Sequence, residues 1–423
     1  MAFLDGLLKR TFIAFRDAQF RRFWIGRLSS TGAFQVRKVV RGWLVYALTG
    51  SALSLGWVSM GWSAATLLFS LVGGVICDRL GKRDVLVGGQ VLCAVVLLAM
   101  ALLISTGAIK VWHFGVSSLL LGVLFSFTMP ARLGLVGGMV PSHVLMNAMA
   151  LSTLGLGIMG FLSSTLGGFL LENISAAAGY YAVALMYGGA ALAWGGLPAD
   201  KPPERQSGSG VSSIRCDLIA GARYIASEPT LLTLVGLELC QVIIFWPLGT
   251  LLPVFASDVF QVGALGLGVL NAIYAVGGLV GALFVAVMGD SRHKGAVLLV
   301  SGALCGICLI LFARANAFYV ALSYLLVVSM AASVYMAIRS TLLQSITVDD
   351  MRGRMASYLR LTWGFLPLGS IPVGALTDAL GARWVATMQG VALISIYSVI
   401  ALARPQLRRL GPSPDHRRSG TEM

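Results

Sequence analysis

Charged residues are scarce in this chain. Asp, Glu, Lys and Arg make up 11% of its 423 residues, whereas 57% are hydrophobic. Soluble globular proteins carry about 25% charged residues, so one soluble core could not absorb this much apolar chain. The shortage of charge therefore excludes an ordinary soluble domain and predicts an integral membrane protein.

Residue types that support catalysis or metal binding are also few. The four histidines are scattered, and their positions suggest no Ser/His/Asp or Cys/His arrangement. The six cysteines fall in apolar runs or on the predicted cytoplasmic side, where disulfides are rare. Cys305-x-x-Cys308 has no His or carboxylate neighbour and is expected to pack inside a helix. We therefore expect no enzyme activity, no catalytic residue and no metal site.

Two further signals are absent. The glycine-rich run 277–281 lacks the strand–loop–helix context and the Lys-Ser/Thr pair of a nucleotide-binding loop. We therefore expect neither ATP nor a cofactor, and a proton gradient is the candidate energy source. The first 22 residues are basic and lack a short apolar region with a cleavage site, which argues against a cleaved signal peptide.

Long apolar runs are abundant, and each is close to the roughly 20 residues that a spanning helix needs. The twelve expected ranges are 23–48, 53–77, 84–106, 112–130, 145–170, 176–197, 230–255, 265–288, 295–313, 317–338, 355–377 and 382–403. The sequence therefore predicts an all-α integral membrane protein with twelve transmembrane helices.

Basic residues are distributed unevenly around these runs. Of the 31 Lys and Arg, only Lys110, Arg314 and Arg383 fall in loops on the predicted outer side. Because cytoplasmic loops of membrane proteins are enriched in Lys and Arg, both termini are predicted to be cytoplasmic. We expect a multi-pass protein of the cell inner membrane. The same asymmetry accounts for the net charge of +14 without a nucleic acid partner.

One long polar interruption, rich in Pro, Ser, Gly and charge, separates the sixth and seventh runs. It divides the chain into predicted parts: a cytoplasmic N-terminal segment 1–22, an N-terminal six-helix bundle 23–197, a cytoplasmic central linker 198–229, a C-terminal six-helix bundle 230–403 and a basic cytoplasmic tail 404–423. The halves repeat weakly, since Pro130-Ala131-Arg132 and Ala337-Ile338-Arg339 lie 207 residues apart.

The most informative stretch runs from Gly74 to Leu86, between the second and third apolar runs. Its pattern is G-x-x-x-D-R-x-G-K-R-x-x-L, and we call it the 2–3 loop motif. The defining residues are Gly74, Asp78, Arg79, Gly81, Lys82 and Arg83. Gly81 permits a tight turn with positive φ, and the basic residues lie where a membrane meets the cytoplasm.

The 2–3 loop motif resembles the signature loop between helices 2 and 3 of the major facilitator superfamily. Four further stretches, at 20–26, 42–52, 130–132 and 352–355, resemble the bacterial branch that includes the enterobactin exporter and related efflux permeases. The resemblance covers the whole chain. It implies two pseudo-symmetric six-helix bundles that rock around a substrate site near the midplane.

The resemblance also implies a role for the 2–3 loop motif as a cytoplasmic gate. Asp78 would meet the start of helix 11, where free backbone amides favour a carboxylate. Arg79 and Arg83 would pair with Asp349 or Asp350. Two departures weaken a drug–proton antiporter: helix 4 has no Arg within 114–129, and Ser163-Ser164 stand where Gly-Pro is expected.

The strongest candidate substrate site is in the first run. Arg37 and Lys38 lie near its middle, and Arg41 follows one turn after Arg37. A cation at the bilayer centre costs at least about 2.5 kcal/mol, so these groups indicate a watery cavity or an anionic substrate held by guanidinium groups. The structural alternative is that some of them extend to the interface or form ion pairs.

Glu238, in the seventh run, is the only acidic residue well inside a predicted span. It could carry a proton, act as counter-ion to Arg37 or Lys38, or be a protonated carboxyl that hydrogen-bonds to a neighbouring helix. Gln241 lies one turn away on the same side, and Trp246-Pro247 is expected to kink the helix beyond it. Polar residues elsewhere, such as Gln389, more often form interhelical hydrogen bonds.

These inferences predict a secondary active transporter that exports a small amphipathic or anionic organic molecule, siderophore-like or drug-like. It would work by alternating access, as a monomer in the lipid bilayer, with proton coupling as one option. An organic-anion uptake permease and a lysophospholipid flippase are the alternatives. A membrane enzyme is disfavoured because the sequence offers no catalytic group set.

Overall fold

The computed structural model describes residues 13–139, 142–198, 211–289, 293–348, 351, 355, 358–359, 361–408 and 410. Within these ranges, side chains are described except at 13, 16, 70–80, 133, 136–139, 142–146 and 211–218. Every regular element in the described ranges is a helix, and none is a strand. The predicted all-α class is therefore confirmed for this part of the chain.

The chain divides into two compact units. Unit 1 comprises Met1–Ser209 and Gln261–Ala272, and unit 2 comprises Gly210–Phe260 and Ile273–Met423. The division after Ser209 falls inside the predicted linker 198–229, of which Val211–Ser227 form helix α8. Residues 261–272, from the predicted C-terminal bundle, pack with unit 1.

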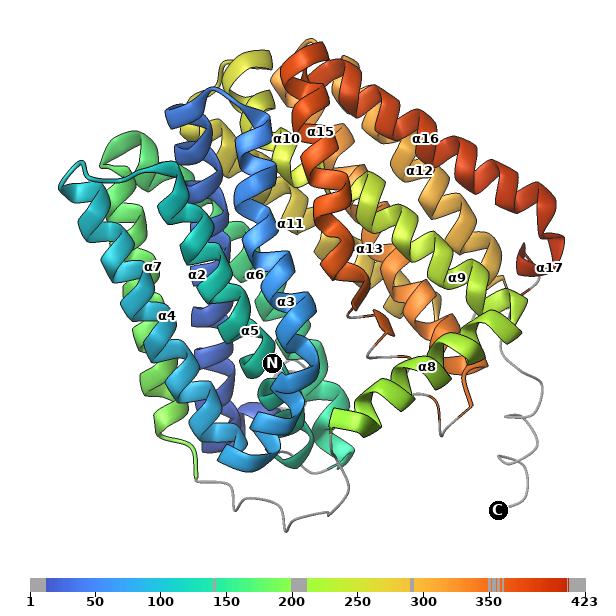
Figure 1. Cartoon of the computed structure of the whole chain (residues 1–423), viewed down its shortest axis with the longest axis horizontal. Coiled ribbons are helices and arrows are strands. Elements are labelled where there is room, and N and C mark those ends of the chain that lie inside the picture. The colour runs from blue at the N-terminus through green and yellow to red at the C-terminus, as the bar shows by residue number, and fades with distance from the viewer. Residues whose placement is uncertain are drawn as a thin grey trace, which may run out of the picture. The chain divides into compact units, whose positions relative to one another are not determined.

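Unit 1 is a bundle of long helices that run side by side, coloured blue to green in Figure 1. Its elements are η1 (Ile13–Arg16), α2 (Ala18–Thr49), α3 (Ala52–Leu80), α4 (Lys82–Ser105), α5 (Val111–Met139), α6 (Ser142–Asn173) and α7 (Ala176–Gly195). Helix α2 packs against α6 and α7, α3 against α5, and α4 against α5 and α7. The predicted runs thus become closely packed helices.

Local sequence explains where these helices begin and end. The Asp17 side chain caps α2 by accepting hydrogen bonds from the backbone N–H groups of Gln19 and Phe20. Gly50 ends the same helix in the left-handed conformation, with φ of +62°. Ser51 then caps α3 through the N–H of Ser54. One short Gly-Ser turn therefore joins two long helices.

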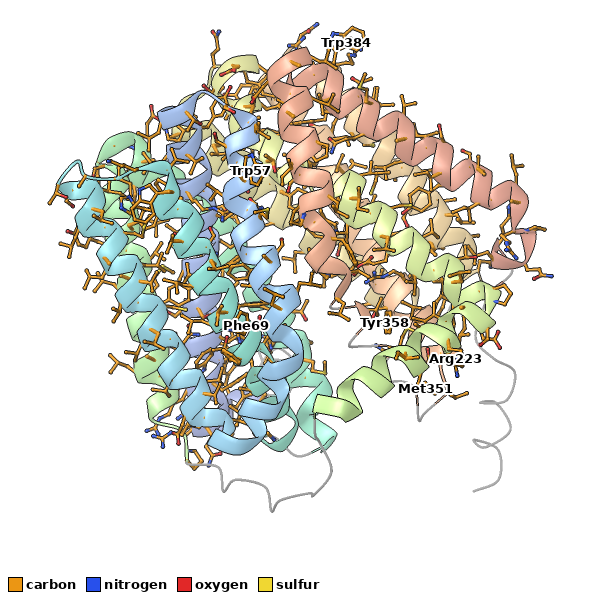
Figure 2. The ribbon with its side chains drawn as sticks, viewed as in Figure 1. Trp57, Phe69, Arg223, Met351, Tyr358 and Trp384 are labelled. Atoms are coloured by element: carbon orange, nitrogen blue, oxygen red, sulfur yellow. The ribbon has the colours of Figure 1, made fainter. Side chains whose placement is uncertain are left out.

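Unit 2 holds the remaining helices. They are α8 (Val211–Ser227), α9 (Pro229–Cys240), η2 (Gln241–Phe245), α10 (Leu248–Val254), η3 (Phe255–Val259), α12 (Lys294–Arg314), α13 (Phe318–Ile346), η4 (Trp363–Phe365), α15 (Leu366–Leu380), α16 (Ala382–Ala403) and α17 (Pro405–Arg408). Helix α12 packs between α13 and α16. Arg223 and Met351 lie at one end of this unit, and Trp384 lies at the other (Figure 2).

Helix α11 (Gly263–Met288) begins in unit 1 and ends in unit 2. A Cβ atom at Gly168 of α6 would lie 2.9 Å from Gly268 Cα, so the two backbones approach this closely only because both residues are glycine. Glu172 Oε2 accepts hydrogen bonds from the N–H groups of Ala264 and Leu265, at 3.0 and 3.4 Å. A carboxylate from α6 thus caps the start of α11.

Ten stretches of the described chain are long and apolar enough to cross a membrane, and they coincide with ten of the twelve predicted spans. The first predicted span lies in α2, which is not among the ten because it carries Arg27, Arg37, Lys38 and Arg41. The span predicted at 355–377 is described only in part, as η4, α15 and a few preceding residues. The number twelve therefore stays a prediction.

The seventh predicted span is broken, as Trp246-Pro247 indicated, but the break begins earlier. Helix α9 ends at Cys240, a π-turn covers Gln241–Phe245, and α10 starts at Leu248. Trp246 N–H reaches the carbonyl of Gln241 at 3.1 Å, which is the five-residue spacing of a π-helix. Such turns frequently mark functional positions in helices.

Candidate functional site

Arg37 of α2 is buried, with 4% of its surface exposed. Its guanidinium carbon lies 5.4 Å from the ring centroid of Phe34 and 5.2 Å from that of Trp62. The Trp62 ring in turn lies 4.9 Å from the ring of Phe125. Arg37 Nε has no hydrogen-bond partner among the described residues. We call Arg37, Phe34, Trp62 and Phe125 the Arg37 cluster.

The two other predicted cations of α2 are half-buried. Arg41 Nη1 donates a hydrogen bond to Ser118 Oγ at 3.0 Å, and Ser118 is fully buried. Arg41 therefore reaches into the bundle instead of extending to the interface. Lys38 lies next to Arg37 in the same turn of α2. The three predicted cations thus sit on one stretch of one helix.

The described carboxylates of unit 1 lie at helix ends. Asp17 caps α2, Asp84 is in the first turn of α4, and Glu172 is in the last turn of α6. A buried cation costs at least about 2.5 kcal/mol at the bilayer centre, and cation–π contacts return about 0.5–2 kcal/mol. The aromatic rings around Arg37 therefore offset only part of its cost, and an anionic ligand would offset more.

Arg132 is a half-buried cation that was not expected within a span. The fourth span was expected to end at Pro130, but α5 continues through it to Met139. Arg132 Nη2 donates to Ser30 Oγ of α2 at 3.2 Å, and its guanidinium carbon lies 5.4 Å from the Trp194 ring. The stretch 114–129 still has no arginine, and Arg132 lies beyond it, in the part of α5 that follows Pro130.

Glu238 of α9 forms an ion pair with Arg339 of α13. Glu238 is 2% exposed and Arg339 is 5% exposed, so the pair is buried within unit 2. Oε2 of Glu238 faces Arg339, whereas its Oε1 is buried without a hydrogen-bond partner in the described chain. An ion pair with Arg339 was not among the roles that the sequence suggested for Glu238, which were a proton carrier, a counter-ion to Arg37 or Lys38, or a protonated carboxyl bonded to a neighbouring helix.

Next to this pair lies a narrow recess, partly open to solvent, whose free volume of about 10 Å³ has room for roughly one water molecule. Its lining residues are Glu238, Gln241, Phe245, Trp246, Ala332, Tyr335 and Met336. They come from α9, the π-turn with the residue after it, and α13. One buried carboxylate and a mainly apolar wall therefore meet at one place, which we call the Glu238 recess.

The π-turn that forms part of this wall is held from two sides. Gln389 Nε2 of α16 donates to the carbonyl of Ile244 at 2.6 Å, and this confirms the interhelical role expected for Gln389. The Trp246 ring lies 4.7 Å from that of Trp363 in η4. Contacts from α16 and η4 therefore meet the broken helix at the π-turn and at the residue that follows it.

Residues 74–80 of the 2–3 loop motif form the end of α3, and Gly81, which follows, has φ of +83° as predicted. Arg83 Nη2 donates to the carbonyl of Gly195 at the end of α7, and Nη1 lies 3.8 Å from Asp84. The Lys82 side chain runs past Gly134 of α5. The side chains of Gly74, Asp78 and Arg79, and the expected partners Asp349 and Asp350, lie outside the described residues.

This chain is similar to known transport proteins along most of its length. The family model described as Major Facilitator Superfamily matches residues 23–368. The multidrug efflux pump Tap of Mycolicibacterium fortuitum is 26% identical over 385 residues, which cover 87% of this chain and 91% of the pump. The enterobactin exporter EntS of Shigella flexneri is 24% identical over 423 residues, covering 96% and 95%.

A solved structure shares the fold at much lower sequence similarity. The crystal structure of a POT family transporter in complex with 5-aminolevulinic acid superposes with a TM-score of 0.76 at 11% identity. The match covers 92% of this chain and 97% of that transporter. At this identity the likeness concerns the fold.

Proposed function

Because this chain belongs to the Major Facilitator Superfamily, a family of multi-pass membrane transporters, we propose that it exports small amphipathic organic anions by alternating access. We place it in a bacterial inner membrane with both termini cytoplasmic. It would act as a monomer, without ATP or a bound cofactor, and a proton gradient would drive it.

The Arg37 cluster is the observation that carries this proposal. It combines a buried guanidinium group, an Nε without a partner in the described structure, and three aromatic rings. A ligand with a carboxylate or sulfonate on an aromatic body would satisfy both the charge and the rings. Lys38 and Arg41 would add positive potential from the same helix.

The direction of transport is supported by relatives. The two proteins compared above are named as an efflux pump and an exporter, and they align with most of this chain. Export is therefore our first choice over uptake. The 2–3 loop motif would close the cytoplasmic face during the cycle, with Asp78 and Arg79 as the residues that act there.

A vesicle assay tests substrate class and direction together. Everted membrane vesicles that contain the protein would be given fluorescein, a fluorescent aromatic anion, with and without an imposed proton gradient. Export predicts gradient-dependent accumulation in everted vesicles. Accumulation only in right-side-out vesicles would make the protein an uptake permease. No transport in either orientation would refute an aromatic-anion carrier.

Arg37→Gln is the variant that tests the site. It removes a charge that we expect to contact the cargo, and charged hydrogen bonds contribute about 1.5–3 kcal/mol. We therefore expect KM for fluorescein to rise roughly 10- to 100-fold. Arg314→Gln is the matched control, because Arg314 stacks on the exposed Trp384 at 4.3 Å and lies in a predicted outer loop. An equal rise in KM for both variants would contradict the assignment of the substrate site to the Arg37 cluster.

A further inference from the structure

Three buried polar side chains with unpartnered atoms line the Glu238 recess. Glu238 and Gln241 lie one turn apart where α9 passes into the π-turn, and Tyr335 comes from α13. Each of them is at most 3% exposed. Glu238 Oε1, both polar atoms of the Gln241 amide and the Tyr335 hydroxyl have no hydrogen-bond partner among the described residues. Burying such groups without hydrogen bonds is costly, so their gathering at one place points to a common partner.

The size of the recess restricts what that partner is. Its free volume of about 10 Å³ is the room that one water molecule needs. An aromatic ring or any other organic group is too large for it. A single water molecule and a small bare ion are the occupants that fit.

Charge decides between these two. Arg339 already compensates the negative charge of Glu238, so a cation in the recess would lose its hydration shell without a counter-charge. An anion would be repelled by Glu238 Oε1. A neutral water molecule meets neither penalty. It also suits the mixed chemistry of the wall, because a carboxylate oxygen accepts, a phenolic hydroxyl donates and an amide does either.

We propose that the Glu238 recess is a binding site for one water molecule. The water would donate to Glu238 Oε1, accept from the Tyr335 hydroxyl and form a third hydrogen bond with the Gln241 amide. Three hydrogen bonds are typical of a buried water. The recess is partly open to solvent, which gives the water a way in. The bound water would thus tie α13 to the start of the π-turn beside the ion pair.

The competing arrangement is a direct hydrogen bond from the Gln241 amide to Glu238 Oε1, which their spacing of one turn permits. It would leave the recess dry and the Tyr335 hydroxyl unbonded. An experimental structure that resolves ordered water distinguishes the two. We expect a density peak within about 3.2 Å of both Glu238 Oε1 and the Tyr335 hydroxyl. A direct bond between Gln241 and Glu238 with no such peak would overturn the proposal.

A pair of substitutions at Ala332, which lines the recess, gives a test by sign. Valine and threonine have nearly the same shape, and either would displace the water. Only threonine brings a hydroxyl that can replace its hydrogen bonds. In thermal unfolding of the full-length protein in detergent, Ala332→Thr should therefore keep a Tm about 2–4 °C above that of Ala332→Val. A dry recess predicts the reverse order, because the buried hydroxyl would then be the costlier group.

Ala337 supplies the matched control. It is on the same helix, is half-buried like Ala332 and lies outside the recess. Ala337→Thr and Ala337→Val carry the same differences in helix propensity, so their Tm values should agree within about 1 °C. A gap between this pair as large as that at Ala332 would overturn the proposal, because the effect would then belong to the helix and not to the recess.

A change of salt tests the remaining occupant. The Tm of the wild type should be the same in sodium chloride and in choline chloride at equal concentration. A rise in Tm specific to sodium that is lost in Ala332→Val would replace the water site with a cation site and overturn the proposal. None of these measurements involves transport, so their outcome is independent of the vesicle assay with fluorescein and of the proposed function.

Discussion

Breaking the buried ion pair of unit 2 should have a large and non-additive effect on stability. Glu238 and Arg339 are 2% and 5% exposed, so either group alone would be a buried charge without its partner. Losing one member of such a pair costs about 3–5 kcal/mol, whereas replacing both with neutral groups of similar volume is often near neutral. We therefore expect Glu238→Gln and Arg339→Met each to destabilise the protein more than the double variant does.

The expected loss of stability can be converted into a fall in Tm. With about 2.1 cal/mol/K of unfolding entropy per residue, a chain of 423 residues loses about 3–6 °C in Tm for 3–5 kcal/mol. Glu238→Gln should be the costlier single change. A carboxyl left alone can take up a proton and become neutral, but a guanidinium group cannot.

Thermal unfolding of the four proteins in detergent measures this cycle. The control is Asp84→Asn, which removes a pair to Arg83 whose side chains are 27% and 69% exposed. Exposed pairs contribute about 0–1 kcal/mol, so this variant should shift Tm by about 1 °C or less. Additive Tm losses for Glu238 and Arg339 would show that the two side chains do not stabilise each other, and would refute the reasoning.

Three further predictions concern other parts of the chain. Asp78→Asn should insert and fold but transport slowly; wild-type rates in the vesicle assay would remove Asp78 from the gate. A cysteine placed at Lys110 should react with a membrane-impermeant maleimide in sealed cells and one at Arg83 should not, and the opposite labelling would reverse the orientation. Gly168→Val should lower Tm by several degrees, because its side chain would press on Gly268 Cα; an unchanged Tm would mean that α6 and α11 are not held together there.

The sequence was informative about features that depend on nearby residues. Helix positions follow from apolar runs and from short-range signals such as the Asp17 cap and the Gly50 terminus. The positive φ of Gly81 follows from the turn that joins two helices. The break near Trp246 was also predictable, because Pro247 cannot donate a backbone hydrogen bond. In each case the cause lies within a few residues of the effect.

Pairings between distant helices were much harder to predict. Arg339 was noted only as the repeat partner of Arg132, 207 residues earlier, although Arg339 is buried and Arg132 half-buried. Arg132 bonds to Ser30 in the first long helix, and Arg339 pairs with Glu238 in the seventh. The repeat spacing therefore carried a usable signal: equivalent arginines reach equivalent helices. The hydropathy pattern concealed this signal, because it placed the end of the fourth span at Pro130 and so left Arg132 outside that span.

The π-turn at Gln241–Phe245 has a consequence for insertions and deletions. A π-turn holds one more residue than the α-helix around it, and each residue of an α-helix turns the chain by about 100°. Deleting a single residue between 241 and 245 would let the segment close as ordinary α-helix. Everything after it would then rotate by about a quarter turn, carrying Trp246 away from Trp363. Homologous chains that lack this residue should therefore differ in the identity of both tryptophans, while substitutions within the turn leave its register unchanged.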